Sequence, residues 1–234
     1  MLKNILVIDS GVGAISIVNE IKKLLSANFL IYIDNKNAPL GNKTTCELNK
    51  IADNIVDYAT NLTKIDLVVI ACNTLTTSSI NYLRKKYNNI EFVGTEPNIK
   101  FKEYPAIVLC TKYTHDNCKI LNNVNCDKLA LPKLSSLIDT NLEDLNNCEI
   151  YLNGFIPLLE KYKSISLGCT HYTYIKKFLK DKLPNIKIYE NKYGVAKRVE
   201  NLLNINGNLQ KSKIKIILSK KDDKFKKNLL KYLS

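Results

Sequence analysis

Residues 5–13 read ILVIDSGVG, a continuous apolar run that ends in an acid and a glycine-containing turn. An apolar run of this length, bounded by a turn, is typical of a β-strand covered on both faces of a parallel sheet. After the turn, apolar residues recur at helical spacing, at Ile15, Val18, Ile21 and Leu25. The stretch therefore predicts a strand, a turn and a helix in succession.

The same alternation continues along the chain. Further strands are predicted at residues 29–33, 65–71, 92–94, 106–109, 128–130, 164–167, 187–189 and 214–218. Helical periodicity lies between and after them, at residues 46–62, 76–87, 111–122, 155–161, 174–180, 195–203 and 225–233, whereas residues 134–139 fit a helix or a tight loop. Strands that alternate with helices indicate an α/β fold with mainly parallel sheets flanked by helices.

Two segments of the chain are similar to each other. Residues 69–74 read VIACNT and residues 166–171 read SLGCTH, so each predicted strand ends in a small residue, a cysteine and polar side chains. We therefore expect two pseudo-symmetric lobes with an active site between them. The first lobe is predicted to span residues 1–95 plus about 208–234, and the second residues 96–207, with the polar stretch 204–213 returning the chain to the first lobe.

Composition excludes several classes of protein. The net charge of +13 invites a nucleic-acid interpretation, but the lysines are spread along the chain, the only arginines are Arg84 and Arg198, and no RNA- or DNA-binding signature is present. No apolar run reaches the roughly 18 residues of a membrane span, and the N-terminus does not resemble a signal peptide, so a cytoplasmic protein is expected. The seven cysteines are odd in number in a chain that is not small, and a reducing compartment is expected, which argues against a disulfide framework. None falls in a Cys-x2-Cys pair, which argues against a structural zinc site.

Reactive side chains fall where predicted strands end. In open α/β sheets, ligands bind outside the carboxyl ends of the strands. Asp9 follows the first strand, and Cys72 and Cys169 follow the two similar ones, with His171 beside the second. Two thiols on opposite faces of one carbon would form a matched acid/base pair, as a racemase requires. Asp9 would assist Cys72 and His171 would assist Cys169.

Each of these features has a simpler explanation when taken alone. A single cysteine at a strand end is more often a buried apolar residue, and an Asp-Ser-Gly sequence is an ordinary turn. Gly11 and Gly13 lack the downstream residues of a phosphate loop and the third glycine of a dinucleotide site. The combination of two similar cysteine segments with a neighbouring acid and histidine favours the catalytic interpretation.

The motifs resemble those of the aspartate/glutamate racemase family, and within it the glutamate-specific branch. The resemblance covers nearly the whole chain and rests on IDSGVG (8–13), APLGNKT (38–44), ACNT (71–74), GTEP (94–97), LGCTHY (167–172) and GVAKRV (194–199). It implies an isomerase that racemises glutamate with Cys72 and Cys169 as the bases, with no cofactor and no metal. It also implies a supply of D-glutamate for peptidoglycan synthesis, and hence roles in cell wall biogenesis and cell shape.

The resemblance also implies a set of substrate-binding residues and shows some departures. The expected set is Ser10, Leu40, Gly41, Asn73, Thr74, Thr111, Thr114 and Thr170. Leu40 stands where the family has a tyrosine, and Asp139 stands where the family has a supporting glutamate near the catalytic histidine. Ala14 and Thr173 replace a usual glycine and a usual proline.

Three alternatives stay open at this point. A shorter pocket or an added positive group would favour aspartate, or another amino acid, as the substrate. A degenerate family member could bind a ligand without catalysis, although both cysteine motifs are intact.

The expected partner is the small-molecule substrate, with no nucleic acid and no membrane, and a homodimer is one option for assembly.

Overall fold

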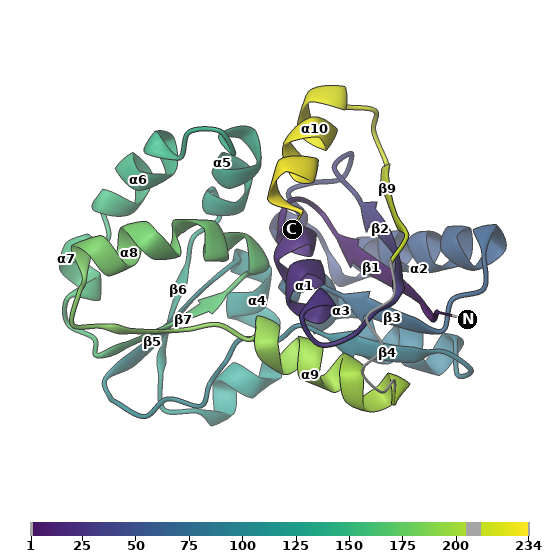
Figure 1. Ribbon diagram of the computed structural model, residues 1–234. Coiled ribbons are helices and arrows are strands. Elements are labelled where there is room, and N and C mark those ends of the chain that lie inside the picture. The colour runs from purple at the N-terminus through teal and green to yellow at the C-terminus, as the bar shows by residue number, and fades with distance from the viewer. Residues whose placement is uncertain (1, 205–211, 234) are drawn as a thin grey trace.

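The computed structural model describes residues 2–204 and 212–233, which form two lobes that each contain a parallel sheet (Figure 1). In spatial order, the first sheet consists of β4 (Glu91–Gly94), β3 (Leu67–Ile70), β1 (Asn4–Asp9), β2 (Asn28–Ile33) and β9 (Ile214–Leu218). The second consists of β6 (Asp127–Ala130), β5 (Ala106–Cys110), β7 (Ser164–Gly168) and β8 (Lys187–Tyr189). All pairings are parallel, which confirms the predicted α/β architecture with two lobes.

Helices cover the sheets and connect successive strands. The longer helices are α1 (Gly13–Lys22), α2 (Thr45–Leu62), α3 (Asn73–Lys86), α9 (Lys192–Leu203) and α10 (Asp223–Tyr232). The second lobe carries α4 (Lys112–Asn117), α5 (Leu134–Thr140), α6 (Asn146–Asn153), α7 (Ile156–Leu159) and α8 (Lys176–Lys182). Short 3-10 turns are η1 (Leu40–Asn42), η2 (Lys119–Asn123) and η3 (Thr170–Ile175).

The first strand shows why both faces of the first sheet are covered. Ile5 and Val7 belong to the apolar cluster on the α1 side, whereas Leu6 and Ile8 belong to the cluster on the α2 side. Successive side chains of a strand point to opposite faces, so a continuous apolar run needs helices on both. The α1-side cluster also contains Leu167 of β7 and so continues into the second lobe.

The C-terminal segment adds an edge strand to the first sheet. Strand β9 pairs with β2, with Ile31 opposite Ile216. Helix α10 follows it, and Figure 1 shows α1 and α10 between the first sheet and the second lobe.

The position of α9 differs from the predicted lobe boundary. This helix packs against α1 and β4 of the first lobe, so the chain returns at residues 190–192, soon after β8. The predicted crossing at 204–213 includes residues 205–211, which lie outside the described residues. We propose that α9 belongs to the first lobe, which would end the second near Tyr189. Periodicity identifies the helix, but it does not say which sheet the helix covers.

Two helical segments of the structure differ from the sequence prediction. The predicted helix 111–122 is broken at Cys118, whose backbone is extended, into α4 and η2. No element is predicted for residues 140–154, where the structure has helix α6, which buries Cys148 and Leu152.

Candidate active site

Two thiols from different lobes lie at strand ends in the structure. Cys72 follows β3 and precedes α3, and Cys169 follows β7 and precedes η3. Both are buried, with 7% and 6% of their surface exposed. The carboxyl ends of parallel strands lie at one edge of a sheet, and here the edges of the two sheets face each other. Thr170 Oγ1 donates a hydrogen bond to Asp9 Oδ2 at 3.1 Å and so joins the second lobe to the first.

Asp9 provides a buried acid at the end of β1. Burial raises the pKa of Asp9 to about 6, although the charge on His171 and the backbone N–H of Ser10 lower it. The Ser10 N–H donates to Asp9 Oδ1 at 2.7 Å. A carboxyl group with this pKa can exchange a proton near neutral pH.

The surroundings of Cys72 favour its neutral thiol form. Burial raises the pKa of Cys72 well above the ordinary value, and the negative charge of Asp9 raises it further. Hydrogen bonds from the backbone N–H groups of Leu75 and Thr74, at the start of α3, lower the pKa of Cys72. Cys72 therefore begins as a proton donor, and it needs a change of environment to become a base.

Cys169 has a different partner. His171 Nδ1 lies 3.8 Å from Cys169 Sγ, and His171 Nε2 lies 3.1 Å from Asp139 Oδ2. Burial would lower the pKa of His171, but the Asp139 carboxylate raises it through charge and hydrogen bonding, and the result lies well above 6.5. The Asp139 carboxylate thus favours the imidazolium form of His171, which would donate one N–H to each partner.

Asp139 also reaches the first lobe. Its Oδ1 accepts a hydrogen bond from the backbone N–H of Val12 at 2.9 Å. Val12 is the N-cap residue of α1, where no side chain of the helix itself satisfies the free N–H groups. A carboxylate at this position satisfies such a group and interacts favourably with the helix dipole. The predicted supporting acid therefore connects His171 to the start of α1.

Two glycines of the turn after β1 pack directly against these groups. A Cβ atom on Gly11 would overlap Asp139 and His171, and one on Gly13 would overlap Thr170 and Asp9. The turn needs glycine because no space is left for a side chain. The sequence shows the glycines and Asp9 but not the other three neighbours, which lie more than 120 residues further along the chain.

The remaining predicted binding residues line the same boundary between the lobes. Thr74 Oγ1 lies 2.9 Å from Thr111 Oγ1, which in turn donates to Thr114 Oγ1 at 3.1 Å. Gly41 lies against Thr111, and Leu40 packs in the apolar cluster that contains Cys72. These groups form a hydroxyl-rich surface with an apolar wall.

Asn73 offers an unused acceptor. Its Nδ2 donates to the backbone oxygen of Thr95 at 2.9 Å, whereas its Oδ1 is buried with no hydrogen-bond partner among the described residues. A buried oxygen without a partner costs free energy unless a ligand or water satisfies it. Asn73 Oδ1 is therefore ready to accept an N–H group from a ligand.

An open cavity of about 250 Å³ adjoins this site. Ser10 and Asp139 contribute to its wall from the site itself, and Asn35, Lys220 and Phe225 contribute from loops and from α10. We call it the mouth cavity. Sequence reasoning missed its C-terminal residues, because nothing local in the sequence indicates that residues 220 and 35 adjoin.

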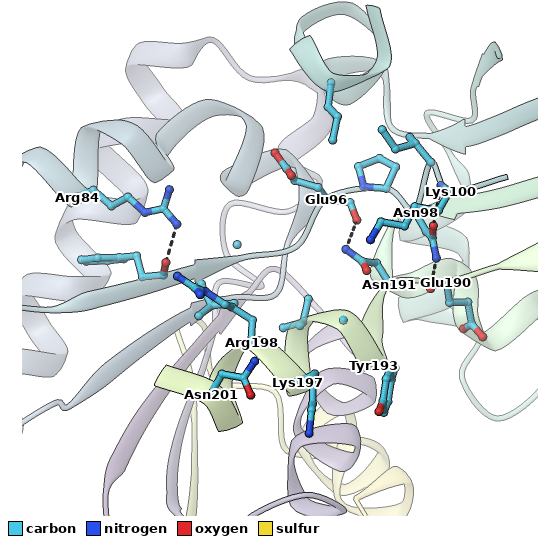
Figure 2. Close-up of a pocket in the computed structure, with 18 residues that line it drawn as sticks. Arg84, Glu96, Asn98, Lys100, Glu190, Asn191, Tyr193, Lys197, Arg198 and Asn201 are labelled. Atoms are coloured by element: carbon cyan, nitrogen blue, oxygen red, sulfur yellow. Dashed lines mark hydrogen bonds between the residues drawn. The ribbon is translucent and has the colours of Figure 1, made fainter. Parts of the chain in front are cut away.

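A larger cavity lies elsewhere, at the two chain crossings between the lobes (Figure 2). It measures about 690 Å³, and Arg84 and Arg198 extend into it from α3 and α9. Asn98 Nδ2 donates to Glu190 O at 3.1 Å and Asn191 Nδ2 donates to Glu96 O at 3.0 Å, which ties the crossings together. Since no predicted catalytic residue lines it, the chemistry is expected in the thiol site instead.

Neither a metal centre nor a membrane span is found in the part of the chain that the structure describes. No three His, Cys, Asp or Glu side chains there are grouped to hold a metal ion. No helix of residues 2–204 and 212–233 is long and apolar enough to cross a membrane.

Comparison with known proteins identifies the family. The chain is 34% identical to a glutamate racemase of Clostridium acetobutylicum over 237 residues, which cover 93% of this chain and 92% of the relative. This chain belongs to the glutamate racemase family. A glutamate racemase of Leptospira interrogans is 30% identical over 216 residues, covering 84% of this chain and 81% of that family member. A comparison with models of known families gives no match.

Solved structures of the family show the same fold. Glutamate racemase from Escherichia coli, solved with L-glutamate and an activator, matches 100% of this chain and 94% of its own with a TM-score of 0.85 at 24% identity. The Campylobacter jejuni family member matches 98% of both chains with a TM-score of 0.85 at 20% identity. These structures confirm the fold, and the relative from Clostridium acetobutylicum confirms the family suggested by the sequence motifs.

Proposed function

We propose that the protein interconverts L- and D-glutamate by removing the Cα proton with one cysteine and returning a proton from the other. The observation that carries this proposal is the pair of buried thiols from opposite lobes, each with its own titratable partner: Asp9 for Cys72, and the His171–Asp139 pair for Cys169. The curated relatives named glutamate racemase support the choice of substrate.

The proposed reaction needs only proton transfer. In one direction, the Cys169 thiolate takes the Cα proton, and the electron pair left on Cα is delocalised into the α-carboxylate. The Cys72 thiol then gives its proton to the opposite face of Cα, which inverts the centre and leaves Cys72 as the thiolate. The reverse reaction exchanges the two roles. Two acid/base groups with different environments suit these alternating roles.

The partners of the thiols would control the charge on each sulfur. The imidazolium of His171 would stabilise negative charge on Cys169, whereas the ionised Asp9 would disfavour it on Cys72. When Cys72 must act as the base, Asp9 is the carboxylate that can take up its thiol proton. This asymmetry distinguishes the two half-sites, although their backbones are similar.

The hydroxyl and amide groups would hold the substrate. We assign Ser10, Thr74, Thr111, Thr114 and Thr170 to the substrate carboxylates, together with backbone N–H groups at Gly41 and at the start of α3. Asn73 Oδ1 would accept from the substrate ammonium, which would satisfy its unpaired oxygen. Leu40 would supply an apolar wall and no hydroxyl group.

The wider role follows from the activity. D-glutamate made in the cytoplasm would serve peptidoglycan synthesis and so cell wall biogenesis and cell shape. Assembly as a homodimer stays a prediction.

Loss of the circular dichroism of L-glutamate, with no added pyridoxal phosphate, tests the proposal. The signal should decay to zero with L-glutamate and much more slowly with L-aspartate. Decay with aspartate alone would reject the substrate, and no decay with either would favour a non-catalytic family member.

A further inference from the structure

The candidate site lacks a free positive charge of its own. Its predicted residues include no lysine or arginine, and the imidazolium of His171 is matched by Asp139 at 3.1 Å. Glutamate carries two carboxylates and one ammonium near neutral pH, so it enters as a net anion. A cation outside the inner site would favour its entry.

The mouth cavity supplies one. Lys220 is the sole lysine or arginine among the described residues that line this cavity, which also reaches Ser10 and Asp139. Two carboxylates line it as well, and each lies at the N-terminus of a helix, which interacts favourably with its negative charge. Asp139 accepts from the Val12 N–H, and Asp222 accepts from the Phe225 N–H at 2.8 Å as the N-cap of α10. Lys220 has no carboxylate within ion-pair distance among the described residues.

The backbone of Lys220 is fixed by a single side chain. Asn35 Nδ2 donates to Lys220 O at 2.9 Å, and the N–H of Lys220 donates to Asn35 Oδ1 at 2.9 Å. Asn35 follows β2 and Lys220 follows β9, and the parallel pairing of these strands brings the two loops together. The Ser219 hydroxyl adds a hydrogen bond from the N–H of Lys36 at 2.9 Å. These hydrogen bonds involve the backbone of Lys220 and not its ammonium group. They place the lysine at the mouth cavity and leave its charge available to a ligand.

We propose that Lys220 attracts the distal carboxylate of the incoming substrate and that Asn35 is its positioning residue. This inference rests on the proposed function, because it assumes an anionic amino acid as the substrate. The distal carboxylate is common to both enantiomers. Lys220 therefore acts on binding in both directions and takes no part in proton transfer.

Steady-state kinetics of Lys220→Gln in both directions tests the proposal. The Michaelis constants for L- and D-glutamate should rise by the same factor, about two- to fivefold at low ionic strength, with kcat unchanged. Lys220→Glu should raise both constants further. The difference from wild type should shrink as ionic strength rises from about 0.01 M to about 0.3 M, because salt screens exposed charges.

The neighbouring residue provides a matched control. Lys221 lies 3.6 Å from Asp223, is 87% exposed in its side chain and does not line the cavity. Lys221→Gln removes the same charge and should leave both Michaelis constants near the wild-type values. Asn35→Ala keeps the charge of Lys220 but removes the two hydrogen bonds that hold its backbone. It should raise both Michaelis constants, by less than Lys220→Gln does.

The outcomes separate this inference from the proposed function. If wild-type protein racemises glutamate and Lys220→Gln behaves like Lys221→Gln, the role of Lys220 is wrong and the racemase proposal stands. A fall in kcat without a rise in the Michaelis constants would also overturn it. If wild-type protein does not racemise glutamate, both fail.

Discussion

The carboxylate of Asp139 accepts a hydrogen bond from the backbone N–H of Val12 at 2.9 Å, across the boundary between the two lobes. The other oxygen of the same carboxylate lies 3.1 Å from His171 Nε2. One side chain therefore sets the charge of a catalytic candidate and holds the lobes together at the site. The contact between the lobes at Val12 and the imidazolium form of His171 depend on the same acid.

Replacing Asp139 by Asn should change how stability depends on pH. The pKa of His171 is raised above 6.5 in the folded protein, so its stabilising contribution is fully present below about pH 6.5 and is lost as pH rises through the folded value. Asp139→Asn should reduce this contribution. Urea unfolding at about pH 6 and about pH 9 measures it, and an unchanged pH dependence would contradict the charge coupling.

Replacing Asp9 by Asn should stabilise the protein while impairing it as a catalyst. The pKa of Asp9 is raised from 3.8 to about 6, so burying its charge costs stability that grows as pH rises from about 4 to about 6. The neutral variant should gain about 1–3 kcal/mol of unfolding free energy at pH 7. The gain should be small at about pH 4. Urea unfolding at both pH values checks the sign, and a loss of stability at pH 7 would argue against a costly buried charge.

Removing either of the two thiols should be enough to impair racemisation. Cys72→Ser and Cys169→Ser should each lower kcat by about 10²- to 10⁴-fold, because serine is a far weaker acid and base. Cys46→Ser, at an exposed free cysteine, is the control and should keep wild-type kinetics. Circular dichroism of L-glutamate follows all three variants. Near-normal turnover by either active-site variant would remove that thiol from the mechanism.

Replacing Gly11 by Ala should disrupt the site by occupying space. The added methyl group would overlap Asp139 and His171. We expect a loss of about 1–3 kcal/mol in unfolding free energy and a severe loss of activity. At Gly154 the nearest heavy atom to a new Cβ is 3.8 Å away, so Gly154→Ala is a control with little effect. Thermal unfolding and racemase assays compare them, and equal behaviour of the two variants would refute the packing argument.

Local sequence patterns predicted the parts of this molecule that depend on local physics. The apolar runs before Asp9 and Cys72 have no polar face, which predicts strands covered on both sides, and the ends of both strands fall in the candidate site. The same patterns carry no information on contacts between distant segments. The Asp139–Val12 hydrogen bond spans 127 residues and the Asn35–Lys220 pair spans 185. Strand order and helix packing create these contacts.

The central claim is that one thiol removes the Cα proton and the other returns a proton to the opposite face. Isotope exchange in deuterated water tests it most directly. Wild-type protein and L-glutamate are mixed in deuterated water, and both enantiomers are isolated at low conversion. With one base on each face, the D-glutamate product should carry one deuterium at Cα, while the remaining L-glutamate stays almost unlabelled. Deuterium appearing in L-glutamate as fast as in D-glutamate would show a single base that serves both faces, and it would contradict the two-thiol account.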